Sequence, residues 1–185
     1  SAALAYLACI TYVDRQVGRL MQSLDESTYA ENTWVILWSD HGWHLGEKQH
    51  WGKWTPWRQS TRVPLIIVPP RNQQAIRGAT CAEAASLVDV YPTLLEIAHI
   101  APASHAQGVS LVPLLKAPEQ QTERAVLTTV GAGNYALSTR DWRYIRYSTG
   151  EEELYDIATD PHEWTNLVQK AQFKDKRIEL QQKLD

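Results

Sequence analysis

Cysteine, phenylalanine and methionine are scarce in this sequence of 185 residues, which contains two Cys, one Phe and one Met. Cys9 and Cys81 are not part of a Cys-x-x-Cys pair, which excludes zinc-ribbon and thioredoxin-like sites. A disulfide between them stays open at this point, but we expect two buried free thiols.

A strong excess of one charge is also absent. The 18 Lys and Arg residues nearly balance the 21 Asp and Glu residues, which leaves a formal net charge of −3. Such a balance argues against a protein that binds nucleic acid or an anionic membrane through its overall charge. No apolar run approaches the length of about 20 residues that a transmembrane helix needs, so no membrane span is predicted.

The start of the chain lacks an initiator Met and the pattern of a signal peptide. It opens with Ser1-Ala2-Ala3-Leu4, within a predicted helix. We therefore expect a processed or incomplete chain.

Helical and strand patterns alternate in the first hundred residues. An apolar stripe at steps of three and four predicts an N-terminal helix and comprises Tyr6, Ile10, Val13, Val17, Leu20 and Leu24. The continuous apolar runs 34–38 and 63–68 predict strands that are buried on both faces. Residues 86–100 show a helical pattern again. We predict an α/β fold, with part of a mixed, mainly parallel sheet covered by helices.

The last third of the chain has a different pattern. Four short β-rich segments, separated by Gly or Asp turns, occupy 125–130, 135–138, 143–147 and 153–156. Their close spacing predicts a small antiparallel sheet. A terminal helix is expected after Asp160-Pro161-His162-Glu163, which has the pattern of a helix start. We place the boundary between an α/β core part, 1–112, and an antiparallel α+β subdomain, 113–185, in the Pro-containing stretch 100–124.

A candidate metal site follows the first predicted strand. Asp40 and His41 stand at its carboxyl end, where open α/β sheets present ligands, and Gly42 permits a sharp turn after them. A carboxylate oxygen and an imidazole nitrogen could together bind a divalent cation. A structural role for both side chains, with Asp40 as a cap and His41 in a hydrogen bond, is an alternative of equal weight.

The next dozen residues add candidate acids, bases and anion contacts, namely His44, Glu47, Lys48, His50 and Lys53. A cation together with a lysine suits an anionic group such as sulfate or phosphate, whose charge must be offset in the transition state. Six of the eight tryptophans also lie between Trp34 and Trp57. They could stack on sugar faces or simply pack the loop.

These residues resemble the sulfatases of the alkaline phosphatase superfamily, in particular the iduronate-2-sulfatase-like branch. The block Ser39-Asp40-His41-Gly42-Trp43-His44-Leu45-Gly46-Glu47-Lys48, followed by His50-Trp51-Gly52-Lys53, looks like the second metal-ligand block of that family. Further similar blocks occur in the family's order, at 12–20, 61–66, 88–95, 142–147, 153–156 and 160–167. The resemblance covers nearly the whole chain.

The resemblance implies roles for five residues. Asp40 and His41 match residues that complete a calcium site, and Lys53 matches a catalytic lysine that contacts sulfate oxygens. Trp43 and His44 lie beside the metal pair and are expected to bind substrate. The implied fold is an α/β sandwich with a smaller C-terminal unit of antiparallel strands and a helix.

One part of the family pattern is missing. Sulfatases attack sulfur with a formylglycine, made from Cys or Ser in a Cys/Ser-x-Pro/Ala-x-Arg context, and no Cys or Ser of this chain has that context. In the family this nucleophile and further metal ligands lie upstream. The chain therefore resembles the C-terminal portion of a sulfatase, and we expect it to need the N-terminal half and to be inactive alone.

The predicted function is hydrolysis of a sulfate ester, with a sulfated carbohydrate as the expected substrate. Two alternatives remain: a phosphate or phosphonate ester hydrolase of the same superfamily, and a non-catalytic sulfatase-like module. Relatives commonly work in exported compartments, but the sequence itself leaves the localisation open.

Overall fold

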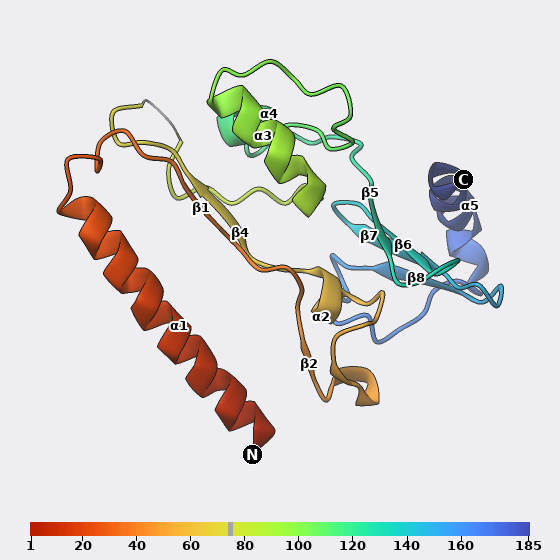
Figure 1. Cartoon of the computed structure of the whole chain (residues 1–185). Helices are drawn as coiled ribbons and strands as arrows, with labels where there is room; N and C mark the ends of the chain where they lie inside the picture. Colours follow the sequence, from red (N-terminus) through yellow and green to blue (C-terminus); the bar gives the residue numbers. More distant parts are fainter. Residues whose placement is uncertain (74–75) are drawn as a thin grey trace.

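The computed structural model describes residues 1–73 and 76–185. Its N-terminal part consists of a long helix, α1 (Ala2–Asp25), and two strands, β1 (Val35–Trp38) and β4 (Leu65–Val68). The strands pair antiparallel, with Val35 opposite Val68 and Trp38 opposite Leu65. The helix and both strands occur where the apolar patterns predict them, and Figure 1 shows α1 standing beside the strand pair.

The surroundings of these elements differ from the expectation. No residue of α1 is buried, and Trp38 of β1 and Ile66 of β4 are each 50% exposed. The predicted mainly parallel sheet with covered faces is therefore not seen: within the described residues, β1 and β4 form one antiparallel pair. The apolar runs predict strands that are buried on both faces, because a run without alternation has no polar face for contact with water. Within the described residues this burial is incomplete, and a further segment would have to cover the strands.

A short irregular unit lies between β1 and β4. It contains the strands β2 (His44–Leu45) and β3 (Trp51–Gly52), which pair with each other, a 3-10 turn, η1 (Glu47–Gln49), and the single-turn helix α2 (Arg58–Thr61). This unit holds the predicted site residues. It lies between the strand pair and the C-terminal sheet in Figure 1.

Two helices follow β4. The 3-10 turn η2 (Leu87–Asp89) leads into α3 (Val90–Ile97), and α4 (Val112–Lys116) comes after a long connection. Asp89 is 3% exposed and organises this region, since its carboxylate accepts hydrogen bonds from the amides of Ser86 and Val109 and from Arg124. The helix predicted for 86–100 is thus confirmed.

The C-terminal part is a four-stranded antiparallel sheet. Its strands are β5 (Val126–Thr129), β6 (Tyr135–Ser138), β7 (Trp142–Arg146) and β8 (Glu152–Asp156), hydrogen-bonded in sequence order. A 3-10 turn, η3 (Ala171–Phe173), and the helix α5 (Lys174–Leu184) end the chain. This arrangement confirms the predicted α/β fold with a small antiparallel sheet and a terminal helix. The division at residue 112 stays a prediction.

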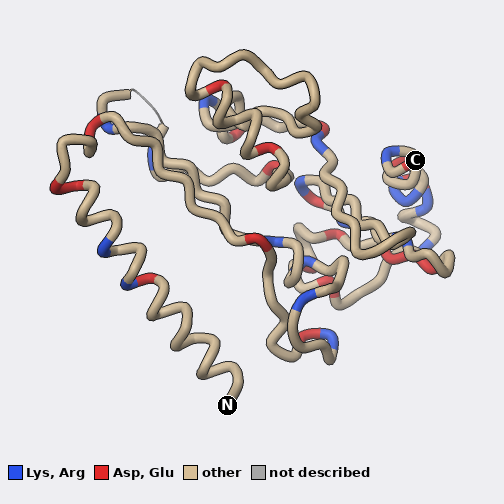
Figure 2. The backbone as a smooth tube through the Cα atoms, in the orientation of Figure 1, with Lys and Arg blue, Asp and Glu red and all other residues tan. Residues whose placement is uncertain are grey.

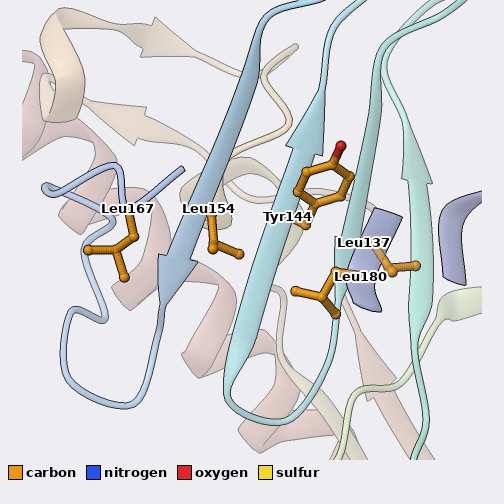
Figure 3. Close-up of a cluster of buried hydrophobic side chains, with 5 residues drawn as sticks. All are labelled: Leu137, Tyr144, Leu154, Leu167 and Leu180. Atoms are coloured by element: carbon orange, nitrogen blue, oxygen red, sulfur yellow. The ribbon is translucent and has the colours of Figure 1, made fainter. Parts of the chain in front are cut away.

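The main core lies between this sheet and α5. Leu137, Tyr144 and Leu154 project from neighbouring strands toward Leu180 of α5, and Leu167 completes the cluster (Figure 3). The opposite face of the sheet carries a second cluster, Ala136, Ile145 and Tyr155, against which Trp57 from the irregular unit packs. The sheet therefore supports the site region on one face and α5 on the other.

The predicted helix start at Asp160 is wrong. The Asp160 carboxylate accepts a hydrogen bond from the amide of Thr165, but Glu163 has a positive φ of 58° and no helix begins there. The reason is tertiary: Glu163 is fully buried in an ion pair with Arg143, and this contact overrides the local capping pattern. The terminal helix starts later, at Lys174.

Two smaller expectations can be compared with the structure. Both cysteines are free, but Cys9 is exposed and Cys81 half-buried, so the expected burial of Cys9 is wrong because α1 has no covering element among the described residues. None of the described helices combines the length and the apolar character that a bilayer crossing demands.

Candidate functional site

Asp40 and His41 follow β1 directly, and local hydrogen bonds define their turn. The amide of His41 donates to Asp40 Oδ1 at 3.0 Å, and Ser39 Oγ donates to the carbonyl of His41 at 2.8 Å. The Asp40 side chain is 81% exposed, and its second oxygen, Oδ2, lies 3.5 Å from His41 Nε2. One carboxylate oxygen therefore holds the turn while the other is open to a ligand.

The two ring nitrogens of His41 have different partners. Nδ1 lies 2.9 Å from the carbonyl oxygen of Gly42, which can only accept, so Nδ1 carries the proton and donates. Nε2 then has a free lone pair and accepts a hydrogen bond from Lys53 Nζ at 2.8 Å. A carbonyl on one ring nitrogen is the usual way in which a protein orients a histidine so that the other nitrogen binds a metal.

Lys53 completes a corner of three functional groups. Its ammonium meets His41 across a loop of a dozen residues and lies 5.8 Å from the ring centroid of the exposed Trp54. Asp40, His41 and Lys53 all line one large open hollow of about 1460 Å³. The structure thus brings together the residues that the sequence predicts as metal ligands and catalytic lysine, which we call the site corner.

A calcium ion fits this donor set in part. Calcium takes six to eight ligands, for the most part oxygens; Asp40 Oδ2 could supply one of these, and His41 Nε2 could add a nitrogen ligand. No group of three or more His, Cys, Asp or Glu residues that could hold a metal occurs in residues 1–73 and 76–185. The described part of the chain therefore provides only a portion of a coordination shell.

Gly42 fixes the position of the corner against α2. Its amide donates to the carbonyl of Ser60 at 2.8 Å, and a Cβ at this position would lie 1.9 Å from the carbonyl oxygen of Gln59. Only glycine permits so close an approach of two backbones. The turn after Asp40 and His41 consequently rests directly on the single turn of α2.

A buried ion pair in turn holds α2 on the C-terminal sheet. Arg143 of β7 and Glu163 are 4% and 0% exposed, and Arg143 Nε lies 2.7 Å from Glu163 Oε1. Arg143 also donates to the carbonyl of Pro56 at 2.9 Å and to Thr61 Oγ1 at 2.6 Å. Glu163 accepts the amide hydrogen of Arg58 at 2.9 Å. Both charges therefore contact the segment 56–61, on which the turn at Gly42 rests.

Lys48 makes a second link to the sheet through Tyr155 and Trp57. Its ammonium lies 4.6 Å from the ring centroid of Tyr155 and 4.8 Å from that of Trp57. Glu153 accepts hydrogen bonds from Trp57 Nε1 at 2.8 Å and from Tyr155 Oη at 2.7 Å. Burial lowers the pKa of Lys48, and the nearby carboxylates of Glu153 and Glu163 oppose that shift.

Glu47 and His50 are not part of the site corner either. Glu47 accepts the amide hydrogen of Leu45 at 2.6 Å, and His50 Nε2 donates to the carbonyl of Lys53 at 2.9 Å. Both side chains shape the loop that presents Lys53. Among the five acid, base and anion-contact candidates of this loop, only Lys53 forms a hydrogen bond with His41 of the site corner.

His44 and Trp43 have different environments although they are neighbours. Trp43 is 42% exposed, with its ring centroid 6.3 Å from that of His41. His44 is fully buried, and its Nε2 lies 2.8 Å from Thr55 Oγ1. Burial lowers the pKa of His44, as do the charges of His50 and Lys48, whereas Glu47 raises it. The predicted contact of His44 with substrate has no support in this placement.

Sequence reasoning missed the residues that hold the site in place. Arg143, Glu163 and Glu153 lie about a hundred residues from the segments that they contact, and one sequence contains no signal of such pairings. A weak signal existed at Arg143, which interrupts the apolar run of a short strand. An arginine in that position needs a partner if the strand is buried.

A comparison with protein families matches residues 1–100 to the sulfatase family. A curated relative, a sulfatase of Formosa agariphila, is 38% identical over 172 residues, which cover 93% of this chain and 33% of that protein. The chain therefore spans about a third of the length of this relative.

Two solved structures align with almost the whole chain. One, of a protein in complex with its substrate D-glucosamine-2-N,6-O-disulfate, aligns with a TM-score of 0.85 and 31% identity over 97% of this chain and 38% of its own. The phosphonate monoester hydrolase of Agrobacterium radiobacter aligns with a TM-score of 0.74 and 27% identity, over 95% of this chain and 38% of its own.

Proposed function

This chain belongs to the sulfatase family, and on that premise we propose that its protein hydrolyses sulfate esters. The observation that carries the proposal is the site corner, where Lys53 Nζ meets His41 Nε2 at 2.8 Å beside the free oxygen of Asp40. A lysine ammonium next to two proposed metal ligands is suited to bind an anionic group with several oxygens, such as sulfate. The finer assignment to the iduronate-2-sulfatase-like branch stays a prediction.

The proposed roles of Asp40, His41 and Lys53 follow from the atoms that these side chains present to the site. Asp40 and His41 would hold a calcium ion, which when bound withdraws charge from the ester's sulfate group. Lys53 would turn its ammonium from His41 to a sulfate oxygen and offset charge that grows in the transition state. The carbonyl of Gly42 keeps the His41 ring in the orientation that offers Nε2 to the site.

A sulfated carbohydrate is the substrate that we propose. Trp43 and Trp54 are 42% and 78% exposed, and Trp54 lines the same hollow as Lys53. Exposed indole rings beside a sulfate-binding group suit the apolar face of a sugar. The structural relative that binds a disulfated glucosamine supports this choice.

We further propose that an N-terminal sulfatase segment completes the site. It would contribute the formylglycine nucleophile and the remaining metal ligands, since Asp40 and His41 alone make an incomplete shell. The exposed apolar face of α1 and the uncovered strands β1 and β4 are surfaces that such a segment would cover.

A sulfate-release assay tests the proposed reaction. The protein is expressed from the complete open reading frame that encodes these residues and is offered a matched pair of esters, an aryl sulfate and an aryl phosphonate. Sulfatase function predicts a higher kcat/KM for the sulfate ester. A preference for the phosphonate would favour the second candidate, which the likeness to a phosphonate monoester hydrolase supports. Failure to hydrolyse either ester, or a sulfated sugar, would indicate a non-catalytic module.

A further inference from the structure

A second, smaller hollow shares two lining residues with the large hollow that contains the site corner. It is lined by Arg58, Gln59, Arg62, Pro161 and His162. Arg58 and Arg62 also line the large hollow that contains Lys53, so the two arginines stand between both hollows. Figure 2 marks basic positions around α2, beside the segment that follows β8. We call the small hollow, with its two arginines and His162, the basic rim.

Neither arginine of the basic rim forms an ion pair with a carboxylate within the part of the chain that the structure describes. Arg58 Nη1 donates to the carbonyl of Pro161 at 3.0 Å, which orients its guanidinium in the rim. Burial and the neighbouring charge of Arg62 lower the pKa of Arg58, whereas the carboxylate of Glu163 opposes that shift. An anion between these cations would relieve their repulsion.

An aromatic side chain extends the rim. Trp164 is 61% exposed, and its ring centroid lies 6.2 Å from that of His162, with 32° between the ring planes. Glu163, between them in sequence, is fully buried in its ion pair with Arg143. The backbone that carries His162 and Trp164 is thus anchored in the interior, so both rings are presented from a fixed segment.

We propose that the basic rim binds the anionic group of a second sugar unit, next to the unit whose sulfate ester is cleaved at Lys53. The proposal rests on the proposed sulfatase function. Guanidinium groups recognise sulfate and carboxylate in the same bidentate manner, so the anion is a further sulfate or a uronic acid carboxylate. Trp164 offers its indole face to that sugar. The protein would accordingly act on multiply charged oligosaccharides.

Kinetics with matched substrates tests the proposal. The protein from the complete open reading frame is compared with Arg62→Ala and Trp164→Ala variants, and exposed Lys170→Ala serves as the control. The substrates are a monosulfated glucosamine, a disaccharide with a second sulfate, and a disaccharide with a uronic carboxylate instead. We expect Arg62→Ala to reduce kcat/KM about tenfold for one or both disaccharides, since a charged hydrogen bond is lost. Turnover of the monosulfated sugar should stay unchanged.

The possible outcomes distinguish a failure of the rim proposal from a failure of the proposed sulfatase activity. Equal losses on all three substrates, or no loss on either disaccharide, would overturn the rim proposal while sulfatase activity stands. If the protein hydrolyses none of them, titration calorimetry with the same disaccharides tests the rim alone. Binding that weakens about tenfold in Arg62→Ala, but not in Lys170→Ala, supports it. Equal affinity of both variants, or no binding to wild type, overturns it.

Discussion

His41 shows how one hydrogen bond can select the chemistry of a side chain. Because its Nδ1 donates to the carbonyl of Gly42, the lone pair of Nε2 faces Lys53 and the open oxygen of Asp40. The other tautomer, with the proton on Nε2, would instead present an N–H to this position and could not bind a cation. The tautomer that the Gly42 carbonyl selects therefore makes the difference between a cation ligand and a further donor.

Calcium binding should depend on Asp40. We expect Asp40→Asn to weaken calcium binding by at least about tenfold, because the amide keeps one oxygen but loses the charge that attracts the ion. Titration calorimetry on the protein from the complete open reading frame measures this effect. Asp175→Asn, an exposed carboxylate in α5, is the control and should bind calcium as the wild type does. Equal affinity of the two variants would remove Asp40 from the metal site.

Protonation of His44 should destabilise the fold. Burial lowers its pKa below the value of 6.5 in the unfolded chain, so the unfolded state takes up the proton first as the pH falls. The free energy of unfolding should therefore decrease with falling pH below about 6.5, with a slope of at most about 1.4 kcal/mol per pH unit from this group.

Urea denaturation between pH 7 and pH 5 measures this slope. A His44→Gln variant should flatten it, even if its stability at pH 7 is lower. Exposed His99, which has a positive φ of 56°, can be replaced by Asn as the control and should leave the slope as it is. A slope that is the same in all three proteins would contradict the assignment to His44.

At the scale of elements, the site corner depends on a chain of contacts that starts in the C-terminal sheet. The Arg143–Glu163 pair holds α2, the carbonyl of Ser60 in α2 accepts the amide hydrogen of Gly42, and Gly42 directly follows Asp40 and His41. The C-terminal part of this chain thus positions the turn that carries Asp40 and His41 without contributing a residue to that turn. This explains why a four-residue helix can be a firm support.

Removing one partner of the buried pair should therefore cost stability and activity together. We expect Arg143→Met to lower the free energy of unfolding by about 3–5 kcal/mol, because Glu163 is left as an unpaired buried charge. Combining Arg143→Met with Glu163→Leu should recover part of this loss.

Arg146→Met is a matched control from the same strand. Arg146 pairs with Asp185, whose side chain is 58% exposed, so its loss should cost less than about 1 kcal/mol. Urea denaturation compares the variants. A double variant that is no more stable than Arg143→Met would contradict the charge-burial argument.

The element pattern of the chain was predictable, whereas its long-range contacts were not. The helix at α1, the strands β1 and β4 and the four C-terminal strands follow from apolar periodicity and turn residues, which are local properties. Asp40 and His41 are predicted as metal ligands from their place after β1, whereas the role of Lys53 follows from the resemblance to sulfatases, and all three roles stay predictions. The helix start at Asp160 was wrong because the distant Arg143 determines the conformation of Glu163.

At the scale of the whole molecule, one face of α1 is an exposed apolar stripe, which is unfavourable in contact with water. Its stripe includes Ile10, Val13 and Leu20, which are 51%, 55% and 72% exposed. Figure 2 shows how few charged positions interrupt this helix. In the sulfatase fold that we propose for the complete protein, this stripe packs against a further segment.

Replacing a stripe residue should thus destabilise the protein from the complete open reading frame. We expect Leu20→Asp to lower the free energy of unfolding by about 3 kcal/mol or more, since a charge would enter an apolar contact. Arg15→Asp, on the polar side of the same helix, should change it by less than about 0.5 kcal/mol. Thermal unfolding measures both, and equal midpoints would show that nothing covers the stripe.

Replacement of Lys53 tests the proposed sulfate-binding site most directly. The protein from the complete open reading frame and its Lys53→Ala and Lys116→Ala variants are compared in kcat/KM for a sulfate ester; Lys116 is an exposed lysine of α4. The site corner predicts a loss of about a hundredfold or more for Lys53→Ala at unchanged thermal stability, and no loss for Lys116→Ala. Equal activity of the two variants would contradict the placement of the sulfate group at Lys53.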